Sequence, residues 1–229
     1  MTIHEMQNLN RDTIEFASKV IAPGMSLIKL RKLCEEYMLS HGADSFWYWD
    51  IGAFVFAGDK TAVSVSGREY ETDHHIIKSN DIITIDLSPQ NNHIWGDYAR
   101  TLIVENGSIV KGVEQIRNCE WRNGLKMENA LHEAMLDFIN ENTTFDELFY
   151  YINELITSGG YVNLDFLGNL GHSIVKNKRQ RIYIEKGNKE KLSAVEAFTF
   201  EPHISLPGSV YGFKKENIYS FNSGIILEL

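Results

Sequence analysis

The stretch 81-DIITIDLSPQNNHIWGDYARTLIVENG-107 decides the fold. It holds two apolar, β-branched runs, "DIITIDL" and "YARTLIV", separated by the turn-forming segment "SPQNNH", a pattern that predicts two neighbouring strands. Asp86 lies inside the first run and Asp97 stands just before the second. Because an ionised carboxylate is costly to bury unless it is paired or binds a cation, either these aspartates face solvent or they share a positive partner.

Composition limits the class of protein. The chain has 229 residues, of which 43% are hydrophobic and 23% are charged, which is typical of a globular protein with a sizeable core. Its formal net charge of −9 argues against a nucleic-acid partner, which would require a basic face. The N-terminus lacks the pattern of a signal peptide, and no apolar run is long enough to cross a membrane. We therefore expect a cytoplasmic protein that contacts no membrane.

The order of the expected elements indicates two related halves. Helical patterns cover residues 5–22 and 26–42, then 113–140 and 144–158. Each pair of helices is followed by strand-like runs, which are 46–58, 61–67 and 81–107 after the first pair and 181–187, 194–205 and 223–229 after the second. Helix, helix and strands thus occur twice, which favours a single α+β domain with an internal duplication around a central sheet.

Three more residues of the kinds that bind metals accompany the two aspartates. Glu201 stands in "AFTFEPHIS", Glu228 in "GIILEL", and His172 between glycine and serine in "LGHSI". Any one of these taken alone is most simply explained as a solvent-exposed strand-end residue. If the strands share one sheet, however, four carboxylates converge and cannot all stay ionised without cations. Two divalent ions would neutralise them, and oxygen ligands with one imidazole suit Mn, Co, Fe or Zn.

The order of these pieces resembles the pita-bread metallopeptidases, a family that includes methionine aminopeptidase, aminopeptidase P and prolidase. The matching segments are "TIDLSP", "GDYART", "LGHSI", "FTFEP" and "ILEL", and "VIAPGMS" resembles the family's N-terminal helix pair. The resemblance implies a pita-bread fold, in which two pseudo-symmetric halves of helix pairs pack on a curved, mainly antiparallel sheet. It also implies that residues 1–229 form one catalytic domain, without the additional N-terminal domain of aminopeptidase P and prolidase.

The resemblance assigns a role to each of the five residues. Asp86 would chelate one metal ion, and Asp97 and Glu228 would bridge the pair. His172 and Glu201 would complete the second ion, and Glu201 would also take a proton from the attacking water. The implied cofactors are two divalent metal ions, which activate water and polarise a carbonyl group.

The chain departs from the family at its substrate-handling histidines. Where the family carries a histidine 17 or 18 residues before the first aspartate, this chain has Arg68 and Glu69. Where a second histidine follows the ligand histidine, this chain has Arg179. His74–His75, nearer to the first aspartate, and His203, just after "EP", are the candidates to replace them.

Three hypotheses about function follow. The leading one is a dinuclear-metal hydrolase, an aminopeptidase or Xaa-Pro type peptidase acting on a peptide or small amide. The first alternative is a metal-binding pita-bread module with little peptidase activity that binds a peptide or protein, and the second is a hydrolase of a non-peptide amide. A creatinase-like amidinohydrolase is disfavoured, because that branch works without metals. The sequence leaves the native metal, the substrate and the oligomeric state open.

Overall fold

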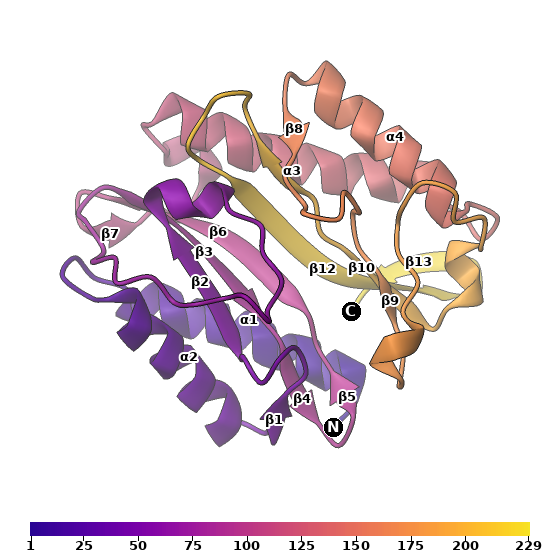
Figure 1. Cartoon of the computed structure of the whole chain (residues 1–229), viewed down its shortest axis with the longest axis horizontal. Helices are drawn as coiled ribbons and strands as arrows, with labels where there is room; N and C mark the ends of the chain where they lie inside the picture. Colours follow the sequence, from indigo (N-terminus) through magenta and orange to yellow (C-terminus); the bar gives the residue numbers. More distant parts are fainter.

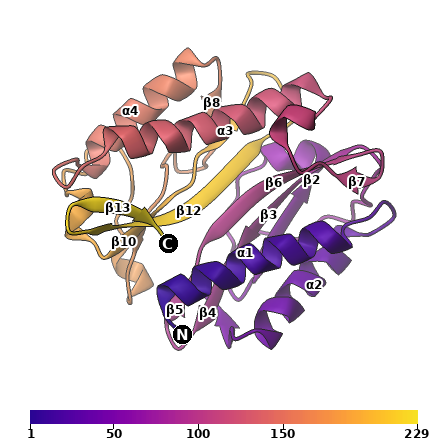
Figure 2. The same ribbon diagram turned by 180° about the vertical axis from the view of Figure 1, so that it is seen from behind.

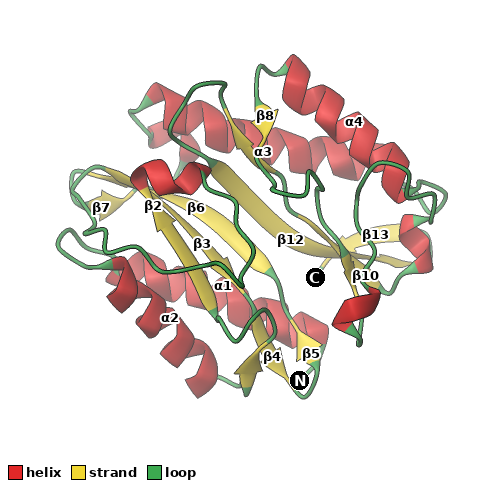
Figure 3. Cartoon of the chain, viewed as in Figure 1, coloured by secondary structure: helices red, strands yellow, loops and turns green.

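The computed structural model describes the backbone of residues 1–229 and every side chain except that of Lys178. Figures 1 and 3 show two similar halves, each with a pair of helices packed on strands. The first half holds α1 (Ile3–Val20), α2 (Leu27–Ser40), β1 (Ser45–Phe46), β2 (Ala53–Ala57), β3 (Asp81–Leu87), β4 (Pro89–Asn91), β5 (Ile94–Trp95), β6 (Tyr98–Glu105) and β7 (Ser108–Ile109). The second half holds α3 (Cys119–Phe138), α4 (Phe145–Ser158), β8 (Val162–Asn163), β9 (Ser173–Ile174), β10 (Ala197–Phe200), β11 (His203–Ser205), β12 (Phe213–Asn222) and β13 (Ile225–Glu228).

One sheet runs through both halves. Its strand order is β2-β3-β6-β12-β10-β9, and β11 and β13 also pair with β12. The two halves meet where β6 pairs antiparallel with β12, with Arg100 opposite Lys215 and Ala99 opposite Glu216. Helices α1 and α3 both lie over the back face of the sheet, as Figure 2 shows. The expected pita-bread architecture, helix pairs on a curved antiparallel sheet, is confirmed.

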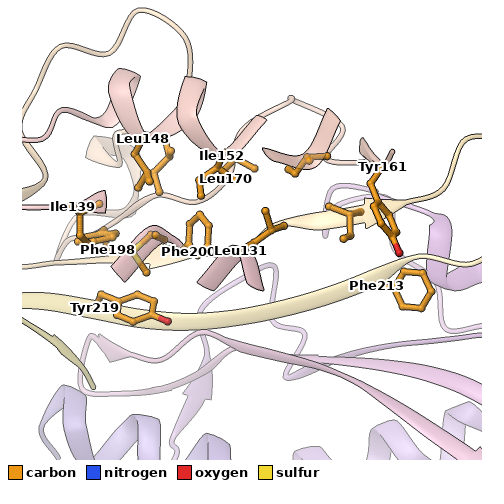
Figure 4. Packing of buried hydrophobic residues seen from close by; sticks show 14 of the residues in the cluster. Leu131, Ile139, Leu148, Ile152, Tyr161, Leu170, Phe198, Phe200, Phe213 and Tyr219 are labelled. Atoms are coloured by element: carbon orange, nitrogen blue, oxygen red, sulfur yellow. The ribbon is translucent and has the colours of Figure 1, made fainter. Parts of the chain in front are cut away.

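Each half buries its own apolar core between helices and sheet. In the second half, α4 begins with a capping box, in which Thr144 and Glu147 each accept a hydrogen bond from the other's backbone N–H. Its buried face joins α3 and the strands in the cluster drawn in Figure 4, where Leu148 and Ile152 lie above Phe198 and Phe200. A separate cluster joins α1 and α2 to β2 and β3. The helices therefore cover the back of the sheet and leave the other face for the site.

Two predicted strands are wrong, and one long strand and three strands of two residues each were not predicted. Residues 61–67 begin within a short 3₁₀-helix, η1 (Gly58–Ala62), and continue as irregular chain and a turn. Residues 181–187 contribute only an isolated bridge between Tyr183 and His172. Both segments contribute to the lining of a pocket, the first through Thr61, Val63, Ser64 and Val65 and the second through Arg181 and Tyr183, whereas Ile184 joins the hydrophobic core. The short strands that were missed are β7, β8 and β9, and the long one is β12, which lies in the centre of the sheet.

Within the described part of the chain, no helix is both long enough and apolar enough to span a membrane.

Candidate metal centre

Strand register brings two acidic residues, Asp86 and Glu216, into one row across the sheet. Asp86 on β3 pairs with Ala99 on β6, and Ala99 pairs in turn with Glu216 on β12. Directly paired residues point to the same face of a sheet, so the two carboxylates flank the small, fully buried Ala99. Asp97 precedes Ala99 by two residues and shares that face. Carboxylate oxygens of Asp86, Asp97 and Glu216 all lie within 4.8 Å of one another.

Helix α1 and the segment 46–58 hold Asp97 in place. The Gln7 amide donates to the Asp97 carbonyl at 3.0 Å and accepts from the Asp97 N–H at 3.2 Å. The Trp47 indole donates to the carbonyl of the preceding Gly96 at 2.9 Å. A Cβ at Gly96 would lie 2.6 Å from the Asn10 amide nitrogen, so glycine lets the strand approach the helix closely. Gln7 therefore holds Asp97 through its backbone N–H and carbonyl groups, and these contacts leave the carboxylate available to bind a cation.

The loop before β9 fixes His172 in one tautomer. Its Nδ1 lies 3.2 Å from the Ser173 carbonyl oxygen, which can only accept, so Nδ1 carries the proton. In the neutral ring the lone pair is then on Nε2, which lies 3.4 Å from Asp97 Oδ2 and 3.8 Å from Glu201 Oε1. Gly171 has a φ of +144°, and a Cβ there would meet the Thr199 carbonyl oxygen at 2.2 Å, so only glycine fits before this histidine.

Lys214 supplies a cation to the same cluster. It precedes Glu216 by two residues on β12 and so points to the same face. Its ammonium lies 2.6 Å from Asp86 Oδ2, 3.0 Å from Glu201 Oε2 and 3.3 Å from Glu216 Oε2. Sequence reasoning missed both Lys214 and Glu216, because the run "FKKENIYSFN" shows no apolar alternation.

The structure does not bring Glu228, the last of the expected metal ligands, into the cluster. Glu228 is the cross-strand partner of Tyr219, three residues beyond Glu216 on β12. Residues three apart on a strand point to opposite faces, so Glu228 lies on the face away from Asp97. There its side chain is 41% exposed and pairs with Arg11 at 3.5 Å. Glu216, only 1% exposed, occupies the place expected for Glu228.

Burial and mutual repulsion dominate the electrostatics of the cluster. Burial raises the pKa of Asp97 to about 6 and also raises that of Asp86, where Lys214 partly opposes it. Burial, together with the charges of Asp97 and Glu201, raises the pKa of Glu216 well above its ordinary value. Burial opposes ionisation of Glu201 too, but the Lys214 ammonium prevails and holds the pKa of Glu201 below normal. One ammonium therefore does not satisfy four carboxylates.

A pocket with aromatic walls opens onto the cluster. Its lining includes Asp86, Asp97, His172, Glu201 and Lys214, and its walls include Tyr48, Phe54, Phe56, Phe166 and Tyr183. Asp165 and Arg181, neither of them singled out from the sequence, add one charge of each sign to the lining. The Arg181 guanidinium also lies 4.9 Å from the centre of the Trp47 ring.

Of the candidate replacement histidines, only His203 lines this pocket. Its Nε2 donates to the Thr61 carbonyl at 2.7 Å, and burial lowers its pKa to about 4, so the ring is neutral at pH 7. His75 is instead bound to Asp81 at 2.7 Å, and His74 is exposed. Arg68 and Arg179 are exposed as well, and neither is among the lining residues of this pocket in the described structure.

The donor set fits a divalent cation. Both Glu216 carboxylate oxygens are buried without a hydrogen-bond partner among the described residues, a costly arrangement that a cation would relieve. Carboxylate oxygens and one imidazole with its lone pair inward are ligands that Mn, Fe, Co and Zn accept.

Comparison with known proteins identifies the family. Residues 2–223 match the model of Metallopeptidase family M24, and the chain belongs to this family of metal-dependent hydrolases. A methionine aminopeptidase of Helicobacter pylori (strain ATCC 700392 / 26695) is 27% identical over 210 residues, which cover 86% of this chain and 75% of that protein. A Xaa-Pro dipeptidase of Lactobacillus helveticus is 25% identical over 132 residues, or 58% of this chain and 33% of that protein.

Solved structures share the fold. The prolidase of Pyrococcus furiosus superimposes with a TM-score of 0.81 at 19% identity, and the X-Pro aminopeptidase of Thermotoga maritima MSB8 with 0.80 at 19%. Each match covers 99% of this chain but only 61% and 59%, respectively, of the solved chain. The organisation of this chain as a single catalytic domain stays a prediction.

Proposed function

We propose that this chain is a peptidase of the aminopeptidase or Xaa-Pro type that uses two divalent cations. The proposed ligands are Asp86, Asp97, His172, Glu201 and Glu216, with Glu216 in place of Glu228. The observation that carries the proposal is the convergence of three carboxylates within 4.8 Å, one of them, Glu216, buried with neither oxygen hydrogen-bonded among the described residues. Such cations supply a water molecule of lowered pKa and polarise the scissile carbonyl.

The side chains around the cations would divide the remaining work. Glu201 stays ionised because Lys214 outweighs the effect of burial, so its carboxylate can accept the proton of the attacking water. His203 donates a hydrogen bond from Nε2–H to the Thr61 carbonyl, which leaves Nδ1 as an acceptor for a substrate N–H. Asp165, in the same lining, offers a carboxylate to a substrate ammonium group.

The walls of the pocket favour a short, partly apolar substrate. The aromatic side chains of Tyr48, Phe54 and Phe166 offer apolar surface, and Arg181 offers a guanidinium that can bind a carboxylate in a bidentate manner. A dipeptide or the N-terminal part of a peptide supplies an ammonium group, an apolar side chain and a carbonyl oxygen together. This is the substrate class that the two peptidase relatives also suggest.

The test is to measure metal content and hydrolysis on the same protein. We expect the chain reconstituted with Mn, Co, Fe or Zn to bind divalent metal and to cleave Xaa-Pro dipeptides or peptides with N-terminal methionine. Asp97→Ala should lose both properties, and Asp137→Ala, at an exposed position of α3, should lose neither. Full turnover by Asp97→Ala would refute the assigned mechanism.

A second candidate is a metal-binding module with little peptidase activity. The observation in its favour is that Arg68, Glu69 and Arg179 stand where the family's substrate-handling histidines are expected, and that all three are exposed. The same experiment distinguishes the two, because metal binding without hydrolysis of any tested peptide would favour the module.

A further inference from the structure

Lys214 is a positive charge placed where cations are expected to bind. Its ammonium contacts Asp86, Glu201 and Glu216, three of the five proposed ligands, at 2.6 to 3.3 Å. Its side chain is 15% exposed, so solvent screens it little. The mechanism above uses Lys214 only to keep Glu201 ionised, which one contact would achieve. The other two contacts need a further explanation.

The ligands fall into two overlapping groups. Asp97, His172 and Glu201 are linked by the contacts of His172 Nε2, at 3.4 and 3.8 Å. Asp86, Asp97 and Glu216 are linked by oxygens within 4.8 Å of one another. Lys214 contacts two members of the second group and a single member of the first. Its ammonium therefore competes mainly for the second group.

Counting charges also indicates that the Lys214 ammonium opposes binding of a second divalent cation. The carboxylates of Asp86, Asp97, Glu201 and Glu216 carry four negative charges, and Lys214 offsets one of them. A first divalent cation leaves one negative charge, so a second would leave the buried cluster with an excess positive charge. Without the ammonium, two divalent cations would balance the four carboxylates. Charge balance matters because an uncompensated charge at this depth is costly.

Building on the proposed metal site, we infer that Lys214 is an internal competitor for the second divalent cation. The chain then holds one cation tightly, on the side of Asp97, His172 and Glu201. The second cation binds beside Asp86 and Glu216 only when the Lys214 ammonium is displaced. The two positions thus differ in affinity because of a residue that is not itself a ligand.

The test compares two neighbouring lysines on opposite faces of β12. Lys214→Met removes the ammonium but keeps a linear side chain. Lys215→Met is the matched control, because Lys215 points to the back of the sheet, where it donates to Asn129 at 2.9 Å. Binding of Mn²⁺ alone is followed by equilibrium dialysis with elemental analysis, and the pairing of ions by electron paramagnetic resonance. Neither readout requires turnover.

We expect wild type and Lys215→Met to bind one Mn²⁺ tightly and a second at least about 100-fold more weakly, as repulsion between a divalent ion and a nearby ammonium predicts. In Lys214→Met the two affinities should approach each other by at least about tenfold, and a spin-coupled pair should form at lower Mn²⁺ concentration. If Lys214→Met does not fold, Lys214→Gln provides the same comparison.

Three results would overturn the inference. The first is equal affinity for the two Mn²⁺ ions in wild type, and the second is a ratio of the two affinities in Lys214→Met that equals the wild-type ratio. The third is weaker binding of both ions in Lys214→Met, which would mean that the lysine positions the ligands. Absence of Mn²⁺ binding in wild type and all variants would instead refute the proposed metal site itself, and the inference with it. Loss of peptidase activity alone bears on neither measurement.

Discussion

Exchanging the two C-terminal glutamates for glutamine, one at a time, provides the sharpest test of the site. Glu216 lies with Asp86 and Asp97 in the buried cluster, whereas Glu228 lies on the opposite face beside Arg11. Both substitutions remove one negative charge and keep the shape of the side chain. We expect Glu216→Gln to lower affinity for divalent metal at least about 100-fold, since even groups that only orient ligands contribute 10–100-fold. Glu228→Gln should retain wild-type metal content.

The metal-free protein should respond in the opposite direction. Two carboxylates 4.8 Å apart repel by about 3.5 kcal/mol at an effective dielectric constant of about 20, and Glu216 has two such neighbours within that distance. Its attraction to the Lys214 ammonium at 3.3 Å is about 5 kcal/mol on the same scale. The Glu216 charge is therefore unfavourable by about 2 kcal/mol before its burial is counted. Removing it should stabilise the metal-free fold.

The assay is thermal unfolding of both variants and wild type, in chelator and in excess Mn²⁺, over a range of pH. In chelator, Glu216→Gln should unfold about 4–8 °C above wild type once Glu216 is ionised. This advantage should grow as pH rises, because the folded-state pKa of Glu216 is raised and ionisation destabilises the native protein. In Mn²⁺ the order should reverse. A Glu216→Gln protein that keeps its metal, or a Glu228→Gln protein that loses it, would refute the assignment.

Three other substitutions test the fold around the site. Gly124→Ala should destabilise the protein by about 1–3 kcal/mol in urea unfolding, because the new Cβ would lie 2.4 Å from the Phe213 ring between α3 and β12. His203→Gln should remove part of the acid sensitivity. The folded-state pKa of His203 is about 4, so the unfolded chain takes up the proton first as pH falls. The free energy of unfolding should therefore drop by on the order of 3 kcal/mol between about pH 6.5 and pH 4. The control His74→Gln, at an exposed position, should not alter this effect. Thr144→Ala should cost about 1 kcal/mol by removing the cap of α4, measured by the same urea method.

Much of the fold and most of the candidate site could be predicted from the sequence. The four long helices show periodic apolar faces, and the capping box at Thr144 marks the start of α4 within a residue. Asp86 and Asp97 stand out because the runs around them are otherwise apolar, so an acid there needs a reason. His172 and Glu201 stand out in the same way, and the structure brings all four together.

The fifth position could not be predicted, because the sequence does not show which strand is central. Glu228 lies in the apolar run "GIILEL" and so satisfied the same criterion as Asp86. That run is β13, which pairs with the far end of β12, and its alternation there places Glu228 opposite Tyr219 and away from the site. Register between strands depends on the whole sheet, whereas the apolar pattern is local.

Strand β12 is hard to recognise in the sequence because it carries residues of the candidate site. A strand in the middle of a sheet that is covered by helices should be apolar on the covered face, but the first half of β12 is polar on both faces. Lys214 and Glu216 point to the carboxylate cluster. On the other face, Lys215 donates to Asn129 of α3 and Asn217 accepts from Arg100. The hydrophobic period that would announce a strand is therefore lost at the residues that carry the chemistry. A run such as "KKEN" between predicted strands of this architecture should accordingly be examined as a candidate central strand. Its charges can be buried because oppositely charged and hydrogen-bonding side chains of neighbouring elements compensate the loss of hydration.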